Sequence, residues 1–209
     1  MKVVIFDMDG TLIDSKKDIT ISVNYIREMH YGLGPLSEEY IVEVINMEVR
    51  NLPKLFYGTE HYEDRDRELF EIHYADQCTQ NPYLYDGIKE TLEELIESNV
   101  KISVATNAPT PFAKRMLKHL GVDKMFDVII GADRVENSKP DPQMLHHILN
   151  HYKYREKKDI AWMVGDNSKD MLSAKAAGIE SMFATWGFTP KSDHEIVVYE
   201  PKEILGIVL

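Results

Sequence analysis

The sequence predicts a protein of the α/β class, with a parallel sheet that carries helices on both faces and an all-helical domain inserted after the first strand. Residues 3–6 form an unbroken apolar run, which is typical of a strand buried inside a parallel sheet. After residue 82, apolar runs alternate with amphipathic stretches at the spacing of βα units. Between these regions, residues 15–82 carry helical periodicity and no strand pattern.

The region 15–82 is expected to form a small domain of four helices. Apolar residues recur near helical spacing over residues 17–30, and Ser37 followed by two glutamates begins a second helix. A short third helix is expected at 52–56, ended by a glycine, and a charged fourth helix at 62–80.

The rest of the chain is expected to complete the core domain. Its strands are predicted at 101–105, 126–130, 160–164, 180–185 and 195–198. Its helices are predicted at 87–98, 110–120, 142–152, 168–177 and 201–205. With right-handed crossovers this order gives a Rossmann-like sheet, built from residues 1–14 and 83–209.

Composition limits the classes of partner. The chain has 209 residues and a net charge of −11, which argues against nucleic acid as a partner because its phosphates would be repelled. Cys78 has no second cysteine to pair with, which favours a reducing compartment. The sequence shows no signal-peptide pattern and no apolar run long enough for a membrane span. We therefore expect a cytoplasmic monomer or homodimer, with no membrane partner, acting on a small molecule.

Polar residues follow several predicted core strands at the point where each strand ends. Because carboxyl ends of parallel strands meet at one edge of the sheet, these groups are expected to converge there. A lysine before the helix at 142–152 is expected to join them. Any one of these polar residues is explained equally well as a turn or cap residue as by a function. Their occurrence together at the same edge of the sheet predicts a site. The candidates are Asp7, Asp9, Thr106, Asn107, Lys139, Asp166 and Asp170.

The charges in this set favour a bound cation. Four ionised aspartates would carry −4, whereas Lys139 and one Mg²⁺ would supply +3. A phosphate dianion would be repelled by the cluster without the metal, and a protonated carboxyl would suit a leaving alkoxide. The cluster is therefore suited to metal-assisted phosphoryl transfer.

These residues resemble the motifs of the haloacid dehalogenase superfamily, specifically its phosphatases with an inserted helical cap. Residues 7–12 (Asp-Met-Asp-Gly-Thr-Leu) match the first motif of that family. Thr106 matches the second motif, Lys139 with the following proline the third, and the segment 165–170 the fourth. The resemblance spans the predicted core domain, with residues 15–82 as the cap.

The resemblance implies a role for each residue. Asp7 would be the nucleophile and form an aspartyl-phosphate, and Asp9 would be the general acid and base. Phosphoryl oxygens would be held by Thr106, Lys139 and the backbone around Gly10 and Asn107. Mg²⁺ would be held by Asp7, the Asp9 carbonyl and Asp166. Asp170 would orient a metal-bound water or Lys139.

Several branches of the family, and one other class, are weighed against a phosphatase. Dehalogenases lack the second acid, so Asp9 argues against them. A phosphosugar mutase would usually have valine where Thr11 stands, together with a cap histidine that residues 15–21 lack. A phospho-accepting signalling domain without turnover has no use for Asp9 and no room for the insert. Trp186 with the next residue is similar to a dipeptide of phosphoglycolate phosphatases, although a tryptophan there is equally explained by packing beneath the sheet.

Two further features are interpreted without a functional role. The cap segment 46–53 departs from the usual glycine-containing pattern and carries Glu48 and Arg50, and we interpret Arg50 as an exposed helix-end residue rather than a group that meets a substrate carboxylate. His147 and His151 are four residues apart on a predicted helix, and a solvated helix face explains them better than a metal site.

Overall fold

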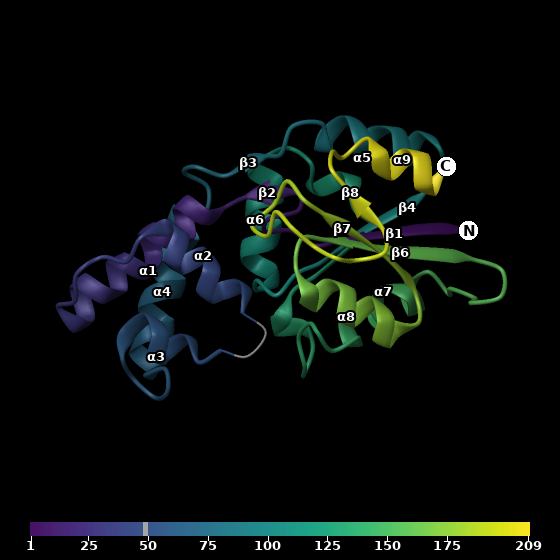
Figure 1. Cartoon of the computed structure of the whole chain (residues 1–209). Coiled ribbons are helices and arrows are strands. Elements are labelled where there is room, and N and C mark those ends of the chain that lie inside the picture. Colours follow the sequence, from purple (N-terminus) through teal and green to yellow (C-terminus); the bar gives the residue numbers. More distant parts are fainter. Residues whose placement is uncertain (48–49) are drawn as a thin grey trace. The chain divides into compact units, whose positions relative to one another are not determined.

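The computed structural model describes residues 1–47 and 50–209 (Figure 1). The chain divides into two compact units, one formed by Met1–Asp14 with Tyr83–Leu209 and the other by Ser15–Pro82. We call them the core unit and the cap unit, and describe each by itself. Glu48, which the sequence analysis singled out, lies outside the described residues.

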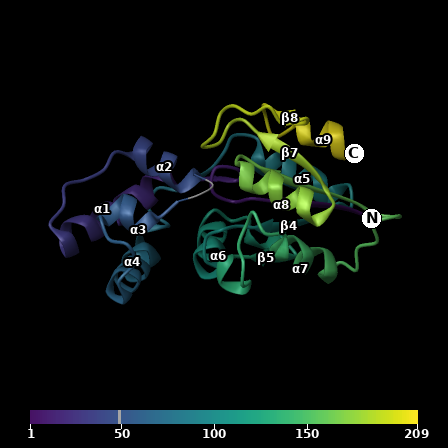
Figure 2. The same cartoon turned by 60° about the horizontal axis from the view of Figure 1, so that its bottom comes forward.

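The core unit is built on a six-stranded sheet in the order β5-β4-β1-β6-β7-β8, in which all neighbouring strands of the described chain are parallel. Figure 2 shows β5 and β8 at opposite edges of this sheet. The central strand β1 is paired on both sides, and Ile5 aligns with Ser103 on one neighbour and Met163 on the other. The strands are β1 (Lys2–Phe6), β4 (Lys101–Ala105), β5 (Val128–Ile130), β6 (Ile160–Gly165), β7 (Glu180–Ala184) and β8 (Val197–Val198).

Helices cover both faces of this sheet, as the sequence predicts. Figure 1 shows α7 and α8 on one face and α5 and α9 on the other. The predicted α/β fold class is therefore confirmed. The core helices are α5 (Ile88–Glu97), α6 (Thr110–His119), α7 (Gln143–His151), α8 (Ser168–Ala177) and α9 (Glu203–Val208).

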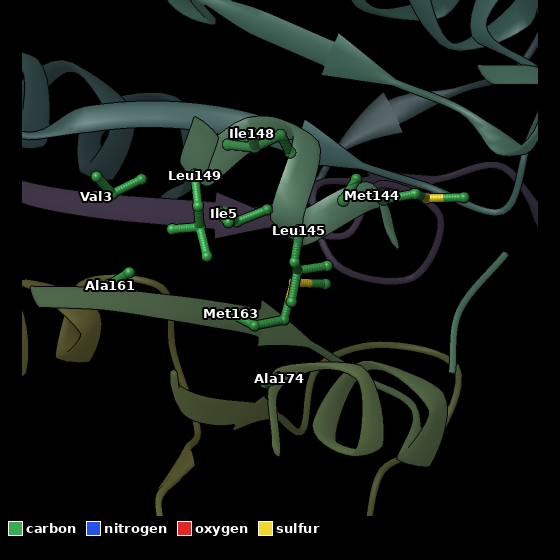
Figure 3. Packing of buried hydrophobic residues seen from close by; sticks show 10 residues of the cluster. Val3, Ile5, Met144, Leu145, Ile148, Leu149, Ala161, Met163 and Ala174 are labelled. Atoms are coloured by element: carbon green, nitrogen blue, oxygen red, sulfur yellow. The ribbon is translucent and has the colours of Figure 1, made fainter. Parts of the chain in front are cut away.

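The face beneath α7 and α8 holds a continuous apolar core (Figure 3). Side chains alternate along a strand, so Val3 and Ile5 both point from β1 into this layer. Four residues of α7 at helical spacing meet them, together with residues of β6 and α8. The remaining buried members include Met144, Leu145, Ile148, Leu149, Ala161, Met163 and Ala174.

Truncation of this core is expected to be costly. Ile148→Ala removes a fully buried side chain and is expected to lower the free energy of unfolding by about 2–5 kcal/mol, because the packed neighbours cannot fill the cavity. The neighbouring His147 is exposed on the same helix, so His147→Ala should stay within about 0.5 kcal/mol of wild type. Urea unfolding followed by circular dichroism checks both values. Equal effects would contradict the assignment of this helix face to the core.

The cap unit holds the four predicted helices within its described residues, α1 (Lys16–Tyr31), α2 (Glu38–Asn46), α3 (Leu52–Tyr57) and α4 (Asp64–Gln77). Ser37 caps α2 by accepting the Tyr40 N–H. Helix α4 begins later than predicted because Glu63 and Asp66 form a capping box at its start. The buried core of this unit is Val23, Ile26, Ile41, Val44, Phe56 and Tyr57.

Arg50 lies at a helix end, as interpreted, but the expectation that it is exposed is wrong. Its guanidinium is half-buried and donates to the carbonyl oxygens of Ile45 and Met47. Burial lowers the pKa of Arg50 from its ordinary value. Arg50 therefore closes the carboxyl end of α2, where free carbonyls attract cations.

The sequence analysis missed a small antiparallel ribbon and misplaced several boundaries. Strands β2 (Ile13–Asp14) and β3 (Tyr83–Leu84) pair with each other, but two residues are too few to show a period. Strand β5 begins two residues later than predicted, at Val128, and follows a 3₁₀ turn at Asp123–Met125. Within the described ranges, no helix is long and apolar enough to cross a bilayer.

Candidate active site

The candidate site lies at the carboxyl edge of the core sheet, where β1 runs between β4 and β6. Asp7 directly follows β1, and its N–H donates to Val164 of β6 at 2.8 Å. Thr106 directly follows β4, and its N–H donates to Ile130 of β5 at 3.0 Å. The sheet register therefore fixes the backbone of both residues before their side chains interact.

A tight turn follows Asp7. The N–H groups of Leu12 and Ile13 both donate to the Met8 carbonyl, at 2.9 and 3.0 Å. Gly10 has a φ of +87°, in a region that other residues rarely adopt. A Cβ on Gly10 would lie 2.3 Å from Asp166 Oδ2, so the turn also needs a glycine for space.

The backbone around Gly10 is still expected to bind a phosphoryl oxygen, but the N–H of Gly10 itself is already used. Its N–H donates to the Ile13 carbonyl at 2.9 Å, inside the turn. A donor that already has a partner is a poor ligand for an anion. Gly10 instead lets the turn and the Asp166 side chain approach each other.

Lys139 joins the site from the loop before α7. Its ammonium lies 2.7 Å from Asp7 Oδ1, 2.6 Å from Asp170 Oδ1 and 2.7 Å from the Ala105 carbonyl. The residue is 4% exposed. Burial alone would lower the pKa of Lys139, but Asp170 and Asp7 raise it above its ordinary value, so the ammonium stays charged.

Asn107 holds the backbone of Lys139. Its side-chain amide donates to the Lys139 carbonyl at 2.9 Å and accepts the Lys139 N–H at 3.0 Å. Phosphate binding by the backbone around Asn107 stays a prediction, since it is the side-chain amide that is used here. The structure therefore makes this side chain a positioning group for the lysine loop.

Asp166 and Asp170 frame the other side of the site. Asp166 Oδ1 accepts the Thr11 hydroxyl at 3.1 Å and Oδ2 accepts the Phe188 N–H at 2.7 Å. Asp170 binds Lys139 and also caps α8 by accepting the Asn167 N–H at 3.2 Å. Both aspartates are 1% exposed.

The acids outnumber the cations in this buried cluster. Burial raises the pKa of Asp166 well above its ordinary value, and the charges of Asp7 and Asp170 raise it further. Burial also raises the pKa of Asp170, to about 6, although Lys139 opposes the shift. Three buried carboxylates therefore lie close together while the ammonium of Lys139 contacts Asp7 and Asp170, and the raised pKa values of Asp166 and Asp170 reflect a shortage of positive charge.

A metal ion fits this donor set. Asp7, Asp166 and Asp170 each offer a carboxylate oxygen, and these atoms lie within 4.8 Å of one another. Carboxylate oxygens are the ligands that hard divalent cations prefer, and a divalent charge would offset the excess of acids. Among the described residues this is the one group of at least three potential ligands with that spacing, which leaves His147 and His151 as exposed helix residues.

The remaining predicted residues also lie at this edge of the sheet. Thr106 is buried, and its hydroxyl oxygen accepts the Ala108 N–H at 3.0 Å, so its own O–H can donate to a ligand. Asp9 is half-buried in the turn, and its backbone pairs with that of Ile13 as an isolated β-bridge. The structure therefore brings the predicted motifs to one place, as the topology requires.

Sequence reasoning missed the groups that hold Asp166. Thr11 was noted only as part of a motif, and Phe188 contributes through its backbone. Their roles depend on long-range contacts, with separations of 155 and 22 residues, which no local pattern records. The signal available was Trp186 and the glycine after it, noted as an isolated dipeptide.

The fold and the site together define the class of protein: a hydrolytic enzyme whose buried carboxylates and lysine meet at the edge of a parallel sheet. The chain belongs to the haloacid dehalogenase-like hydrolase family, whose model matches residues 4–184. The identified resemblance is therefore confirmed, and the chain is a phosphatase-type member of that family.

Individual relatives cover nearly the whole chain. It is 30% identical over 222 residues to the phosphoglycolate phosphatase of Vibrio parahaemolyticus, covering 100% of this chain and 96% of the relative. It is 32% identical to the pyrophosphatase PpaX of Halalkalibacterium halodurans, covering 97% and 91%. A solved structure from Haemophilus somnus shares the fold, with a TM-score of 0.86, 24% identity and coverage of 100% and 98%.

Proposed function

We propose that this enzyme is a Mg²⁺-dependent phosphatase that hydrolyses a small phosphomonoester through an aspartyl-phosphate on Asp7. The observation that carries the proposal is the position of the Lys139 ammonium, 2.7 Å from Asp7 Oδ1 and 2.6 Å from Asp170 Oδ1. A buried carboxylate that is bound to a fixed ammonium keeps its orientation, which a nucleophile requires. The same ammonium would meet the negative charge of an incoming phosphoryl group.

The first half of the reaction transfers the phosphoryl group to the enzyme. One carboxylate oxygen of Asp7 attacks phosphorus, and the bond from phosphorus to the ester oxygen breaks in line. Asp9 gives its proton to the departing oxygen, so the leaving group departs as an alcohol. The Thr106 hydroxyl and Lys139 neutralise charge on the phosphoryl oxygens.

The second half releases phosphate. Asp9, now ionised, accepts a proton from a water molecule that attacks phosphorus, and the bond between phosphorus and the Asp7 oxygen breaks. Asp7, the Asp9 carbonyl and Asp166 would hold Mg²⁺, with Asp170 supporting Lys139. When bound, the ion supplies positive charge that draws a dianionic substrate to an acidic site.

The substrate class is a small phosphorylated metabolite, with a carboxylated phosphate such as phosphoglycolate as the first candidate. The similarity to a phosphoglycolate phosphatase supports this choice, as does Trp186 with its following glycine. A pyrophosphatase stands at nearly the same identity, so pyrophosphate belongs in the test panel.

An assay of turnover with and without metal tests the proposal. We expect purified protein to hydrolyse p-nitrophenyl phosphate and at least one of phosphoglycolate, pyrophosphate and a set of sugar phosphates in the presence of Mg²⁺. Excess EDTA should abolish turnover, and added Mg²⁺ should restore it, because the acid cluster repels a dianion without the ion. Turnover that persists in EDTA would contradict the metal requirement. A long-lived phosphoprotein that never releases phosphate would instead favour a signalling domain, and conversion between sugar phosphates a mutase.

A further inference from the structure

A short segment after β7 contacts the site at three consecutive residues. We call Trp186, Gly187 and Phe188 the strap. The Trp186 indole N–H donates to the Thr11 carbonyl at 2.9 Å, and the Phe188 backbone N–H donates to Asp166 Oδ2 at 2.7 Å. The strap therefore joins the turn after β1 to the turn after β6.

Gly187 is required by space rather than by backbone angle. A Cβ at this position would lie 2.0 Å from the Gly10 carbonyl oxygen and 2.6 Å from the side chain of Asp166. A Cβ atom essentially never lies this close to a non-bonded atom, and one of the neighbours is backbone. The Asp166 side chain is thus enclosed between two glycines, because a Cβ on Gly10 would meet it as well.

Both oxygens of Asp166 are directed by this arrangement. Phe188 donates to one oxygen, and the Thr11 hydroxyl donates to the other at 3.1 Å. Trp186 binds the carbonyl of the same Thr11, so the strap acts on Asp166 once directly and once through Thr11. The half-buried indole therefore has a specific polar partner in the site, in addition to any packing against the sheet.

We propose that the strap is a positioning device for Asp166, which it holds in the orientation needed to bind the metal ion. The inference rests on the proposed function, since it assigns the strap to the same site. A ligand side chain that is already fixed by hydrogen bonds loses little freedom on binding the ion. Groups that orient a metal ligand typically change metal affinity by about 10- to 100-fold when altered.

Two glycine substitutions in the full chain test whether the strap positions Asp166. Gly187→Ala inserts a methyl group against Gly10 and Asp166. Gly206→Ala is the matched control, because a Cβ at Gly206 in α9 meets nothing within 4 Å. Mg²⁺ affinity is measured by titration calorimetry without substrate, and folding by circular dichroism and thermal unfolding. We expect affinity to fall about 10- to 100-fold in Gly187→Ala and to stay within about twofold in Gly206→Ala.

Trp186→Phe keeps an aromatic ring but removes the indole N–H together with part of the ring system, so it tests the strap if Gly187→Ala fails to fold. Loss of one hydrogen bond is expected to weaken Mg²⁺ binding by about 2- to 10-fold. Turnover near wild type should return in this variant at high Mg²⁺, since the chemistry of Asp7 is untouched. Unchanged Mg²⁺ affinity in folded Trp186→Phe, or in folded Gly187→Ala, would overturn the inference. Weakened affinity in a protein whose wild type hydrolyses no phosphate ester would overturn the proposed function and leave the strap in place.

Discussion

Asp7→Asn is expected to abolish turnover while leaving the fold intact. An amide is a far weaker nucleophile than a carboxylate, so no aspartyl-phosphate forms and kcat should fall by at least about 10⁴-fold, as for other enzymes that lose their nucleophile. The effect should appear with every substrate that the wild type hydrolyses. Phosphate release under saturating Mg²⁺ measures it.

The same substitution is expected to leave stability unchanged or to raise it, although it abolishes activity. Asp7 is one of three neighbouring buried acids, and its charge contributes to the raised pKa values of Asp166 and Asp170. Removing one negative charge relieves that repulsion, so metal-free Asp7→Asn should melt at the wild-type temperature or above it. Asp193→Asn, at an exposed aspartate of the core unit, is the matched control for loss of one charge. If Asp7→Asn melts at a lower temperature than wild type and Asp193→Asn does not, the lost activity would be explained by damage to the fold.

The sequence predicts the core unit well because its signals are local. The apolar run of β1 and the helical spacing of α7 each require a buried environment, whatever the neighbours are. Helix α8 begins at Ser168 and ends at Ala177 as expected, since Asn167 caps its start and Gly178 adopts a left-handed conformation at its end. The short ribbon of β2 and β3 lacks such signals and was missed.

The site also has features that the sequence predicts and features that only the tertiary structure reveals. Topology alone brings Asp7, Thr106 and Asp166 together, because residues that follow adjacent parallel strands share one edge of the sheet. Which atom pairs with which is a matter of tertiary contact. The Gly10 N–H pairs inside the turn, and the Asn107 side-chain amide pairs with the backbone of Lys139, and neither pairing is visible in the sequence. A motif identifies the residue types, whereas burial and geometry assign their partners.

Lys139→Met is expected to have the second largest effect, and it acts on stability as well as on activity. The substitution removes the ammonium that lies 2.7 Å from Asp7 and 2.6 Å from Asp170, and leaves these buried acids without that charge. Breaking a buried ion pair in this way typically costs about 3–5 kcal/mol of unfolding free energy. Loss of a fixed positive group at the phosphoryl position should lower kcat by about 10²- to 10³-fold. Lys114→Met, at an exposed lysine of α6, should change neither quantity measurably.

The pH dependence of that destabilisation separates charge from packing. In wild type the pKa of Asp170 is already raised to about 6, so the stability that its neutral form confers is complete below its unfolded pKa of about 4 and is lost as pH rises through about 6. Without Lys139 the pKa of Asp170 in the folded protein rises further, so ionisation of Asp170 lowers the free energy of unfolding by more. The difference in unfolding free energy between wild type and Lys139→Met should therefore be larger at pH 8 than at pH 5. Added Mg²⁺ should reduce this difference at pH 8, because the ion replaces part of the lost charge. Urea unfolding at the two pH values measures the difference. A difference that is equal at both would assign the role of Lys139 to packing of its alkyl chain, and would remove the charge balance on which the proposed chemistry depends.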